Sequence, residues 1–219
     1  LLADTPQKRH ELICQLAQAE EFSVDTETTS TDPMQATLVG MSFAIREGEA
    51  WYVPVGDDPC GLAQEFKSVL ESPTALKIGQ NMKYDLQVLH SCGIHLAEPM
   101  FDTMIAHYLL HPEMRHGMDY LAEAYLNYQT IHIDELIGTG KKQISMAQVP
   151  PQDVCPYAAE DADITLRLKH LFQSQMEEAG CLPLFQDLEM PLMPVLAQME
   201  RNGVCIDSKG LRDTSVHYS

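Results

Sequence analysis

Hydrophobic positions follow two different periods along this chain, and the change of period divides it into a strand-rich part and a helical part. Residues 22–24, 38–45 and 50–54 are short runs of β-forming side chains, and the turn at 47–49 joins the last two. Such runs separated by turns predict an antiparallel meander. A further apolar run at 75–78 predicts another strand.

Helical spacing of apolar residues dominates the remainder of the chain. It predicts helices at residues 6–20, 62–70, 84–91, 103–110, 118–127, 153–178 and 187–202. Strands first and helices afterwards, with helices also between strands, indicate mixed α/β layers. Residues 138–151 contain Gly, Lys, Gln and two prolines and predict a loop, and the helix-stop sequence at 178–183 predicts a domain boundary.

The composition indicates a globular protein, and the cysteines indicate a reducing cytoplasm. With 219 residues, 45% hydrophobic and 21% charged, the chain can bury the core of one domain and part of a second. No apolar run approaches the ~18 residues of a membrane helix. Residues 1–4 lack the pattern of a signal peptide, so we expect a cut boundary there. The six cysteines form no CxxC pair, and we expect buried or free thiols in a reducing cytoplasm.

The charge opposes a simple nucleic-acid role. The chain has 14 basic and 32 acidic residues, for a formal net charge of −18, which is the wrong sign for gripping phosphates unaided. One explanation is an acidic enzyme without a nucleic-acid substrate. The other is a nuclease whose metal ions supply local positive charge while a missing neighbour supplies the basic grip. Composition alone favours the first explanation, so the motifs must decide.

Two carboxylates follow the first predicted strand. In an extended segment Asp25 and Glu27 point the same way, so both would face one spot at the strand end. Two such groups repel each other unless a cation lies between them or one holds a proton. Oxygen clusters of this kind suit Mg²⁺ or Mn²⁺. Taken alone, however, Asp-x-Glu is usually a solvated turn.

Two further polar groups lie on later elements. Asn81 and Asp85 follow the strand at 75–78, where, taken alone, a turn residue and a carboxylate that stabilises the first turn of a helix are better interpretations than a catalytic site. Tyr157 and Asp161 are four residues apart and share one face of a helix, so the hydroxyl could orient a metal-bound water or make a buried hydrogen bond. The neighbouring carboxylates at 160 and 163 fall on other faces and are expected to be solvated.

The order of these motifs carries a resemblance that none of them carries alone. Residues 24–28, 79–85 and 157–163 resemble, in order and context, the three exonuclease motifs of the DEDD superfamily. More closely, the chain resembles the 3′–5′ proofreading exonuclease domain of bacterial DNA polymerase I, a family A polymerase, in the tyrosine-bearing branch. Further matches lie at residues 101–103, 115–119, 138–143 and 189–204, and the resemblance covers about residues 20–207.

The resemblance implies a fold and a mechanism. The fold would be ribonuclease H-like, an α/β fold with a mixed five-stranded sheet flanked by helices. Asp25, Glu27 and Asp161 would hold one divalent ion, and Asp25 with Asp85 would reach a second. The ions would be Mg²⁺ or Mn²⁺, with Zn²⁺ as an alternative at one site. Tyr157 and Glu27 would orient the water that attacks the terminal phosphodiester, releasing a 5′-mononucleotide.

The resemblance also suggests contacts to a single-stranded 3′ end of DNA, together with two departures. Asn81 would contact the DNA, and Arg115 and Lys142 would either contact its phosphates or be ordinary surface charges. Relatives often place a leucine wedge where this chain has Thr31, and a stacking phenylalanine where it has Ile133. Because base stacking on an aromatic ring is worth about 1–3 kcal/mol per base, we expect a weaker hold on the 3′ end.

The resemblance predicts two segments and leaves two rival functions. Residues 1–180 would form the exonuclease domain, and 181–219 the truncated start of the polymerase domain, in a monomeric fragment without a membrane role. An RNA-trimming relative shares the motifs, although the tail at 189–204 argues against it. A catalytically silent packing domain is opposed by the presence of all four carboxylates. His107, His111 and His116 show no HExxH pattern and are expected to be surface or capping residues.

Overall fold

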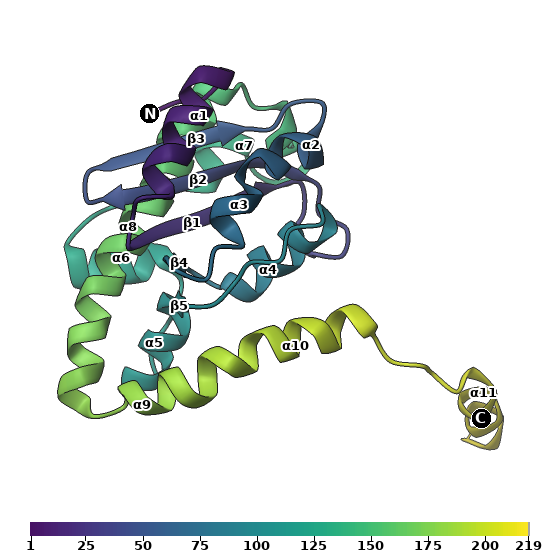
Figure 1. Ribbon diagram of the computed structural model, residues 1–219. Coiled ribbons are helices and arrows are strands. Elements are labelled where there is room, and N and C mark those ends of the chain that lie inside the picture. The colour runs from purple at the N-terminus through teal and green to yellow at the C-terminus, as the bar shows by residue number, and fades with distance from the viewer. Residues whose placement is uncertain (219) are drawn as a thin grey trace.

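A mixed five-stranded sheet forms the centre of the fold in the computed structural model, which describes residues 1–218 (Figure 1). The strand order is β3-β2-β1-β4-β5. The strands are β1 (Glu21–Thr28), β2 (Leu38–Arg46), β3 (Glu49–Pro54), β4 (Leu76–Gly79) and β5 (Met100–Asp102). Strands β1 to β3 pair antiparallel, which confirms the predicted meander, whereas β4 and β5 join parallel to β1.

Helices cover both faces of this sheet and extend beyond it. The α-helices are α1 (Pro6–Leu16), α2 (Pro59–Ala63), α3 (Lys67–Leu70), α4 (Met82–Ser91), α5 (Thr103–Leu110), α6 (Met118–Leu126), α7 (Ile133–Ile137), α8 (Pro151–Ala179), α9 (Leu182–Leu184), α10 (Met190–Asn202) and α11 (Ser208–Tyr218). The shorter turns are η1 (Gln64–Phe66), η2 (Gly140–Lys142), η3 (Met146–Gln148) and the π-helical η4 (Phe185–Glu189). Within residues 1–218, no helix combines the length and apolar character needed to cross a bilayer.

The alternation of side chains along the strands creates two cores. On one face, Phe22 and Phe43 of the sheet pack with Leu12 of α1 and Phe66 of η1, and the rings of Phe43 and Phe66 stack 5.2 Å apart. The 29-residue helix α8 crosses the other face and contacts β1, β2 and β3. Strand β1 therefore lies between two helical layers, and successive residues of β1 serve different layers.

The elements missed by the hydrophobic pattern include β5 and α7. Strand β5 has only three residues, and α7 has five, so neither is long enough to show a period. The segment predicted as a loop at 138–151 is irregular apart from η2, η3 and the first residue of α8.

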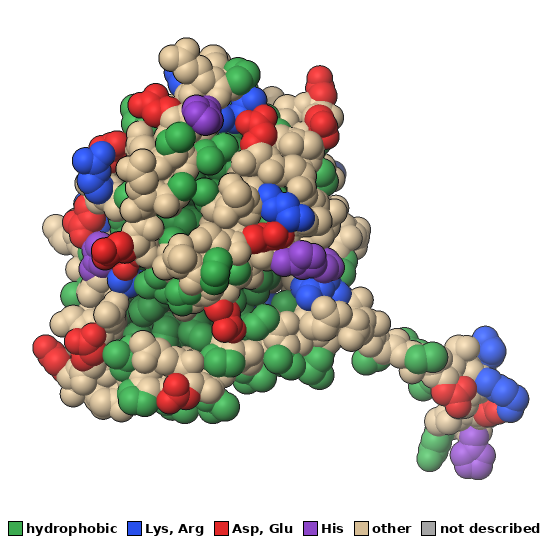
Figure 2. Space-filling model, in the orientation of Figure 1, with side chains coloured by type: hydrophobic (Ala, Val, Ile, Leu, Met, Phe, Trp, Pro, Cys, Tyr) green, Lys and Arg blue, Asp and Glu red, His purple; other side chains and the backbone are tan. Residues whose placement is uncertain are grey.

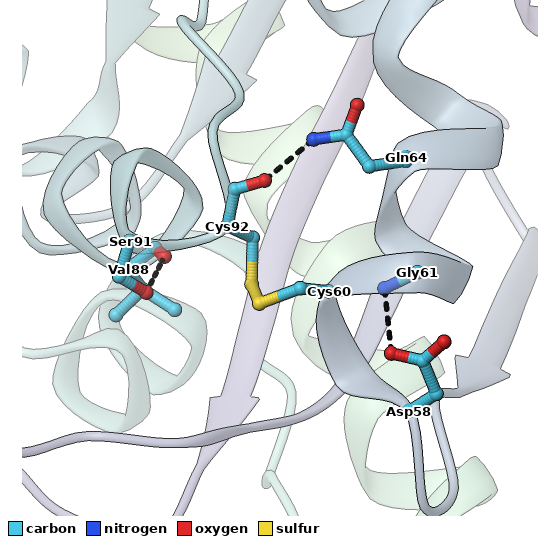
Figure 3. Close-up of a disulfide and its surroundings, with 7 residues drawn as sticks. All are labelled: Asp58, Cys60, Gly61, Gln64, Val88, Ser91 and Cys92. Atoms are coloured by element: carbon cyan, nitrogen blue, oxygen red, sulfur yellow. Dashed lines mark hydrogen bonds between the residues drawn. A yellow bond between two sulfur atoms is a disulfide. The ribbon is translucent and has the colours of Figure 1, made fainter.

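The expectation of free thiols is wrong for two of the six cysteines. Cys60 in α2 and Cys92 at the end of α4 form a disulfide with their Cα atoms 4.7 Å apart (Figure 3). The side-chain amide of Gln64 also donates to the carbonyl of Cys92, so both contacts join the same two segments. The pairing depends on the packing of segments 32 residues apart, which the spacing of cysteines along the sequence does not reveal. The other four cysteines are free.

The C-terminal helices lie along one edge of the body. Helix α10 packs against α4, and its buried residues are Met190, Met193 and Ala197, while α11 stands away from the remainder (Figure 1). Hydrophobic side chains also gather on the outer surface of α9 and α10 (Figure 2). The exposed apolar residues there are Leu184, Leu188, Leu192, Val195, Leu196 and Met199.

Candidate active site

Strand β1 directs three polar side chains toward α8. Ser23, Asp25 and Glu27 alternate along the strand and share one face. The Ser23 hydroxyl donates to the carbonyl oxygen of Ala162 in α8 at 2.7 Å, which fixes the helix against the strand. Because this anchor precedes Asp25 by two residues, both carboxylates face the first half of α8.

Helix α8 supplies the third carboxylate of a partly buried cluster. One side-chain oxygen from each of Asp25, Glu27 and Asp161 lies within 4.8 Å of the others, and this is the one such acidic group found among residues 1–218. Tyr157 precedes Asp161 by one helical turn, and its hydroxyl interacts with the Asp161 carboxylate. The small residues Ala158 and Ala162 are fully buried, so the helix approaches the sheet closely. The structure thus brings these predicted residues together.

Asp85 reaches the site from the opposite layer. It lies in the first turn of α4 and is only 2% exposed. Thr26, which points away from Asp25 and Glu27, donates its hydroxyl to the Asp85 carboxylate at 2.5 Å. Asp85 is outside the three-residue group, yet its pKa responds to the charge of Asp25. Thr26 was not singled out from the sequence because its partner is 59 residues away.

Asp102 holds the N-terminus of α4 in place and is another residue that sequence reasoning gave no role. Its carboxylate accepts the backbone N–H of Met82 at 2.7 Å and of Met104 at 2.8 Å, so one buried side chain caps both α4 and α5. Asn81 precedes α4 in the left-handed conformation with φ of 63°. The Asp102 cap and the left-handed turn at Asn81 together set the direction of α4, the helix that carries Asp85.

Burial and mutual repulsion raise the pKa values of the acidic side chains. Burial raises the pKa of Asp25 to about 6. Burial, followed by the charges of Asp25 and Asp161, raises the pKa of Glu27 well above its usual range. Burial and the charge of Asp25 do the same for the pKa of Asp85 and of Asp161. The cluster therefore stores unfavourable electrostatic energy at neutral pH, which a cation or a proton would relieve.

A cleft of about 570 Å³ opens beside Glu27. Its lining consists of Thr26, Glu27, Thr28, Thr29, Ser30, Thr31, Asn81, Tyr84, Ile133, Ile137, Gln143, Ile144, Ser145 and Met146. Three residues expected to contact DNA, Asn81, Thr31 and Ile133, are therefore in the lining. Arg115 lies in a different surface hollow beside α6, and Lys142 is exposed on η2 outside the lining. The DNA contacts of both remain predictions.

The expectation that residues 160 and 163 are solvated is wrong. Glu160 accepts the hydroxyl of Tyr128 and the backbone N–H of Ile131, both at 2.7 Å. Asp163 accepts the backbone N–H of Gly48 at 2.6 Å. These side chains leave the face of α8 that carries Asp161, as helical spacing requires, but their hydrogen-bond partners Tyr128, Ile131 and Gly48 are distant in sequence. Glu160 consequently ties α8 to the segment that leads into the cleft wall at α7.

One histidine also differs from its expected surface or capping role. His107 is fully buried, and its two ring nitrogens lie 2.7 Å from Nδ1 of His116 and 2.9 Å from the hydroxyl of Tyr125. Burial lowers the pKa of His107 to about 4, so the ring is neutral at pH 7. It packs among aromatic side chains between α5, α6 and α8, which is a core position.

A mixed five-stranded sheet flanked by helices, with acidic side chains converging beside its central strand, defines a protein of the ribonuclease H-like fold. Residues 2–177 match the family model of the DNA polymerase A 3′–5′ exonuclease. The chain therefore belongs to this 3′–5′ exonuclease family, which confirms the resemblance drawn from its motifs.

Comparisons with individual proteins agree with this assignment. DNA polymerase I of Pseudomonas aeruginosa is 43% identical over 206 residues, a match that covers 88% of this chain and 23% of that protein. The chain thus spans about a quarter of the length of this relative. The POL domain structure of Pol1 from M. smegmatis has a TM-score of 0.79 at 20% identity, and the match covers 100% of this chain and 35% of the Pol1 chain. Escherichia coli RNase D has a TM-score of 0.73 at 20% identity, and the match covers 91% of this chain and 50% of the RNase D chain. At these identities the two structures show the shared fold alone.

Proposed function

We propose that the chain is a 3′–5′ exodeoxyribonuclease that removes 5′-mononucleotides from single-stranded DNA 3′ ends, the proofreading part of a DNA polymerase I. The observation that carries the proposal is the convergence of Asp25, Glu27 and Asp161 within 4.8 Å beside an open cleft. The match to DNA polymerase I of Pseudomonas aeruginosa, at 43% identity, supports DNA as the substrate.

The residues present fit two divalent cations. Carboxylate oxygens are the ligands that Mg²⁺ and Mn²⁺ prefer, and Zn²⁺ is an alternative at one position. The Oε1 atom of Glu27 is buried and has no hydrogen-bond partner among residues 1–218, so a positive ligand would satisfy it. Asp25, Glu27 and Asp161 would hold one ion, and Asp25 with Asp85 would hold the second.

The protein side chains have distinct roles in this hydrolysis. When bound, two divalent ions lower the pKa of the attacking water and neutralise the charge on the leaving 3′-oxygen. Tyr157 and Glu27 orient the water for in-line attack. The high pKa of the Tyr157 hydroxyl, raised by burial and by Asp161, keeps it protonated and able to donate a hydrogen bond. Thr26 keeps the Asp85 carboxylate in one orientation from behind the strand.

The cleft is the proposed binding site for the terminal nucleotides. Asn81 and Thr31 offer hydrogen bonds, and Ile133 offers an apolar surface in place of an aromatic ring. Arg115 and Lys142 are proposed to contact phosphates further along the strand. Stacking on an aromatic ring contributes about 1–3 kcal/mol of binding free energy per base. Because Ile133 cannot stack in this way, we predict a higher KM than an aromatic residue would give.

The proposed partner within the full-length protein is a polymerase domain that follows this one. We place the exonuclease domain at 1–180 and the beginning of the polymerase domain at 181–219. The family match ends at residue 177, and the outward side of α10 carries exposed leucines, a valine and a methionine that a neighbouring domain would cover. The bacterial relatives support a cytoplasmic location, and the fragment itself is proposed to be monomeric.

Degradation of a 5′-labelled single-stranded DNA tests the proposal. We expect a ladder of shortened products with Mg²⁺ or Mn²⁺ and none with chelator. Asp25→Ala should abolish the ladder, whereas Asp57→Ala, at an exposed loop position, should leave it unchanged. An RNA of the same sequence separates DNA proofreading from RNA trimming. A folded wild-type chain that produces no ladder in either metal would overturn the enzymatic proposal.

A further inference from the structure

We propose that Tyr52 is a positioning residue that sets the carboxylate of Glu27 from β3, on the face of the sheet that α8 covers, an inference that rests on the proposed function. Tyr52 belongs to β3, two strands from the acidic cluster, and it is only 1% exposed. No motif of the sequence drew attention to it.

The register of the sheet places Tyr52 in the same layer as the acidic side chains. Asp25 pairs with Ser42, and Ser42 pairs with Tyr52, so the three side chains form one cross-strand row on the face that α8 covers. The next row of this sheet begins with Glu27, which pairs with Gly40. Tyr52 and Glu27 are thus separated by one row and by the width of β2.

Because Gly40 has no side chain, the end of the Tyr52 ring can extend across β2 toward Glu27. A Cβ atom at Gly40 would lie 2.3 Å from Cε2 and 2.4 Å from the hydroxyl oxygen of Tyr52. The end of the Tyr52 ring therefore occupies the space that a side chain opposite Glu27 would fill. Directly opposed residues in an antiparallel pair have their Cβ atoms about 4.5–5.5 Å apart. The Tyr52 hydroxyl accordingly stands next to the Glu27 side chain, as the effect of Glu27 on its pKa also indicates.

Two further observations connect Tyr52 with the groups proposed to orient the water. The Oε1 atom of Glu27 and the Oγ atom of Ser42 are buried without hydrogen-bond partners among residues 1–218. The ring of Tyr52 also packs with Val154 and Ala158 of α8, on either side of Tyr157. Tyr52 thus packs against α8, which carries Tyr157, and its hydroxyl is a donor on the same face of the sheet as the unpaired oxygen of Glu27.

Tyr52→Phe separates positioning from packing because the ring stays and only the hydroxyl is lost. Loss of a group that orients a metal ligand usually lowers activity or metal affinity about 10–100-fold. We therefore expect kcat to fall about 10-fold, the Mn²⁺ concentration for half-maximal activity to rise, and KM for DNA to stay unchanged. The rise in Tm caused by Mn²⁺, which requires no turnover, should be smaller than in the wild type.

Tyr125→Phe is the matched control, since it removes a hydroxyl that bonds to His107 outside the site. It should leave kcat and the Mn²⁺ response unchanged. Gly40→Ala should lower kcat because the new methyl group displaces the ring, provided circular dichroism shows a folded chain. If the wild type degrades DNA while Tyr52→Phe matches it in kcat and in the Mn²⁺-induced Tm shift, the role of Tyr52 is refuted and the exonuclease function stands. A wild type without activity would instead refute the function.

Discussion

Asp25 destabilises the metal-free chain at neutral pH, and its replacement by asparagine tests the electrostatic account of the cluster. Burial raises the pKa of Asp25 from 3.8 to about 6. The folded chain therefore binds the proton more tightly than the unfolded chain does. The stability associated with the protonated form is complete below about pH 4 and is lost as the pH rises through about 6.

The expected magnitude follows from these pKa values. A rise from 3.8 to about 6 corresponds to about 3 kcal/mol of unfolding free energy at pH 8. For a chain of 219 residues, each kcal/mol shifts Tm by about 2–4 °C, so Asp25→Asn should raise Tm by about 6–12 °C in chelator at pH 8. Asparagine keeps an acceptor for the backbone N–H of Thr26, which the aspartate also accepts.

Thermal unfolding between about pH 4 and pH 8 measures this effect. In chelator, the Tm difference between Asp25→Asn and the wild type should be near zero at the acidic end and should grow with pH. Asp57→Asn, at an exposed position, controls for a general charge effect. Mn²⁺ should then raise the Tm of the wild type and not that of Asp25→Asn, because ligand binding stabilises the folded state. A variant less stable than the wild type at pH 8, or a difference independent of pH, would refute the reasoning.

Three other perturbations address the supporting contacts. Thr26→Val removes the hydroxyl that holds Asp85 and should lower the cleavage rate about 10-fold in a folded chain; an unchanged rate would contradict this. Glu160→Ala frees the segment before α7 and should raise KM for DNA with little change in kcat, as steady-state kinetics will measure; a fall in kcat alone would show a different role. Reducing the Cys60–Cys92 disulfide, which closes a 32-residue separation, should cost up to about 4 kcal/mol, seen as a lower denaturant midpoint. The double serine variant should not respond to reductant.

Local periodicity predicted the parts of the site that lie on single elements. The two-residue spacing of Asp25 and Glu27 placed both carboxylates on one face of a strand, and the four-residue spacing of Tyr157 and Asp161 placed them on one face of a helix. These relations depend only on backbone geometry. The mixed five-stranded sheet required the family resemblance in addition, because β5 is too short to show a pattern.

The rest of the site depends on contacts between distant segments, which no local period encodes. Thr26 meets Asp85 across 59 residues, and Tyr52 reaches the row of Glu27 only because residue 40 is glycine. The same limit explains the errors about Glu160, whose partners lie on the segment before α7. A polar side chain on the outer face of one helix is solvated only when no other segment packs there, and tertiary structure decides this.

The acidic balance, which first argued against a nucleic-acid role, agrees with the composition of the cleft. As far as residues 1–218 form it, the lining contains the Glu27 carboxylate and hydroxyl, amide and apolar side chains but no lysine or arginine. Few condensed counterions are released by such contacts, so they provide little of the attraction that basic proteins use on DNA. Under the proposed function the carboxylates take divalent cations rather than lysines, because such ions would relieve their repulsion and act on the phosphate at the same place. Under the proposed function, a net charge of −18 therefore separates two tasks: this chain supplies the cutting site, and basic surface elsewhere supplies the long-range hold on DNA.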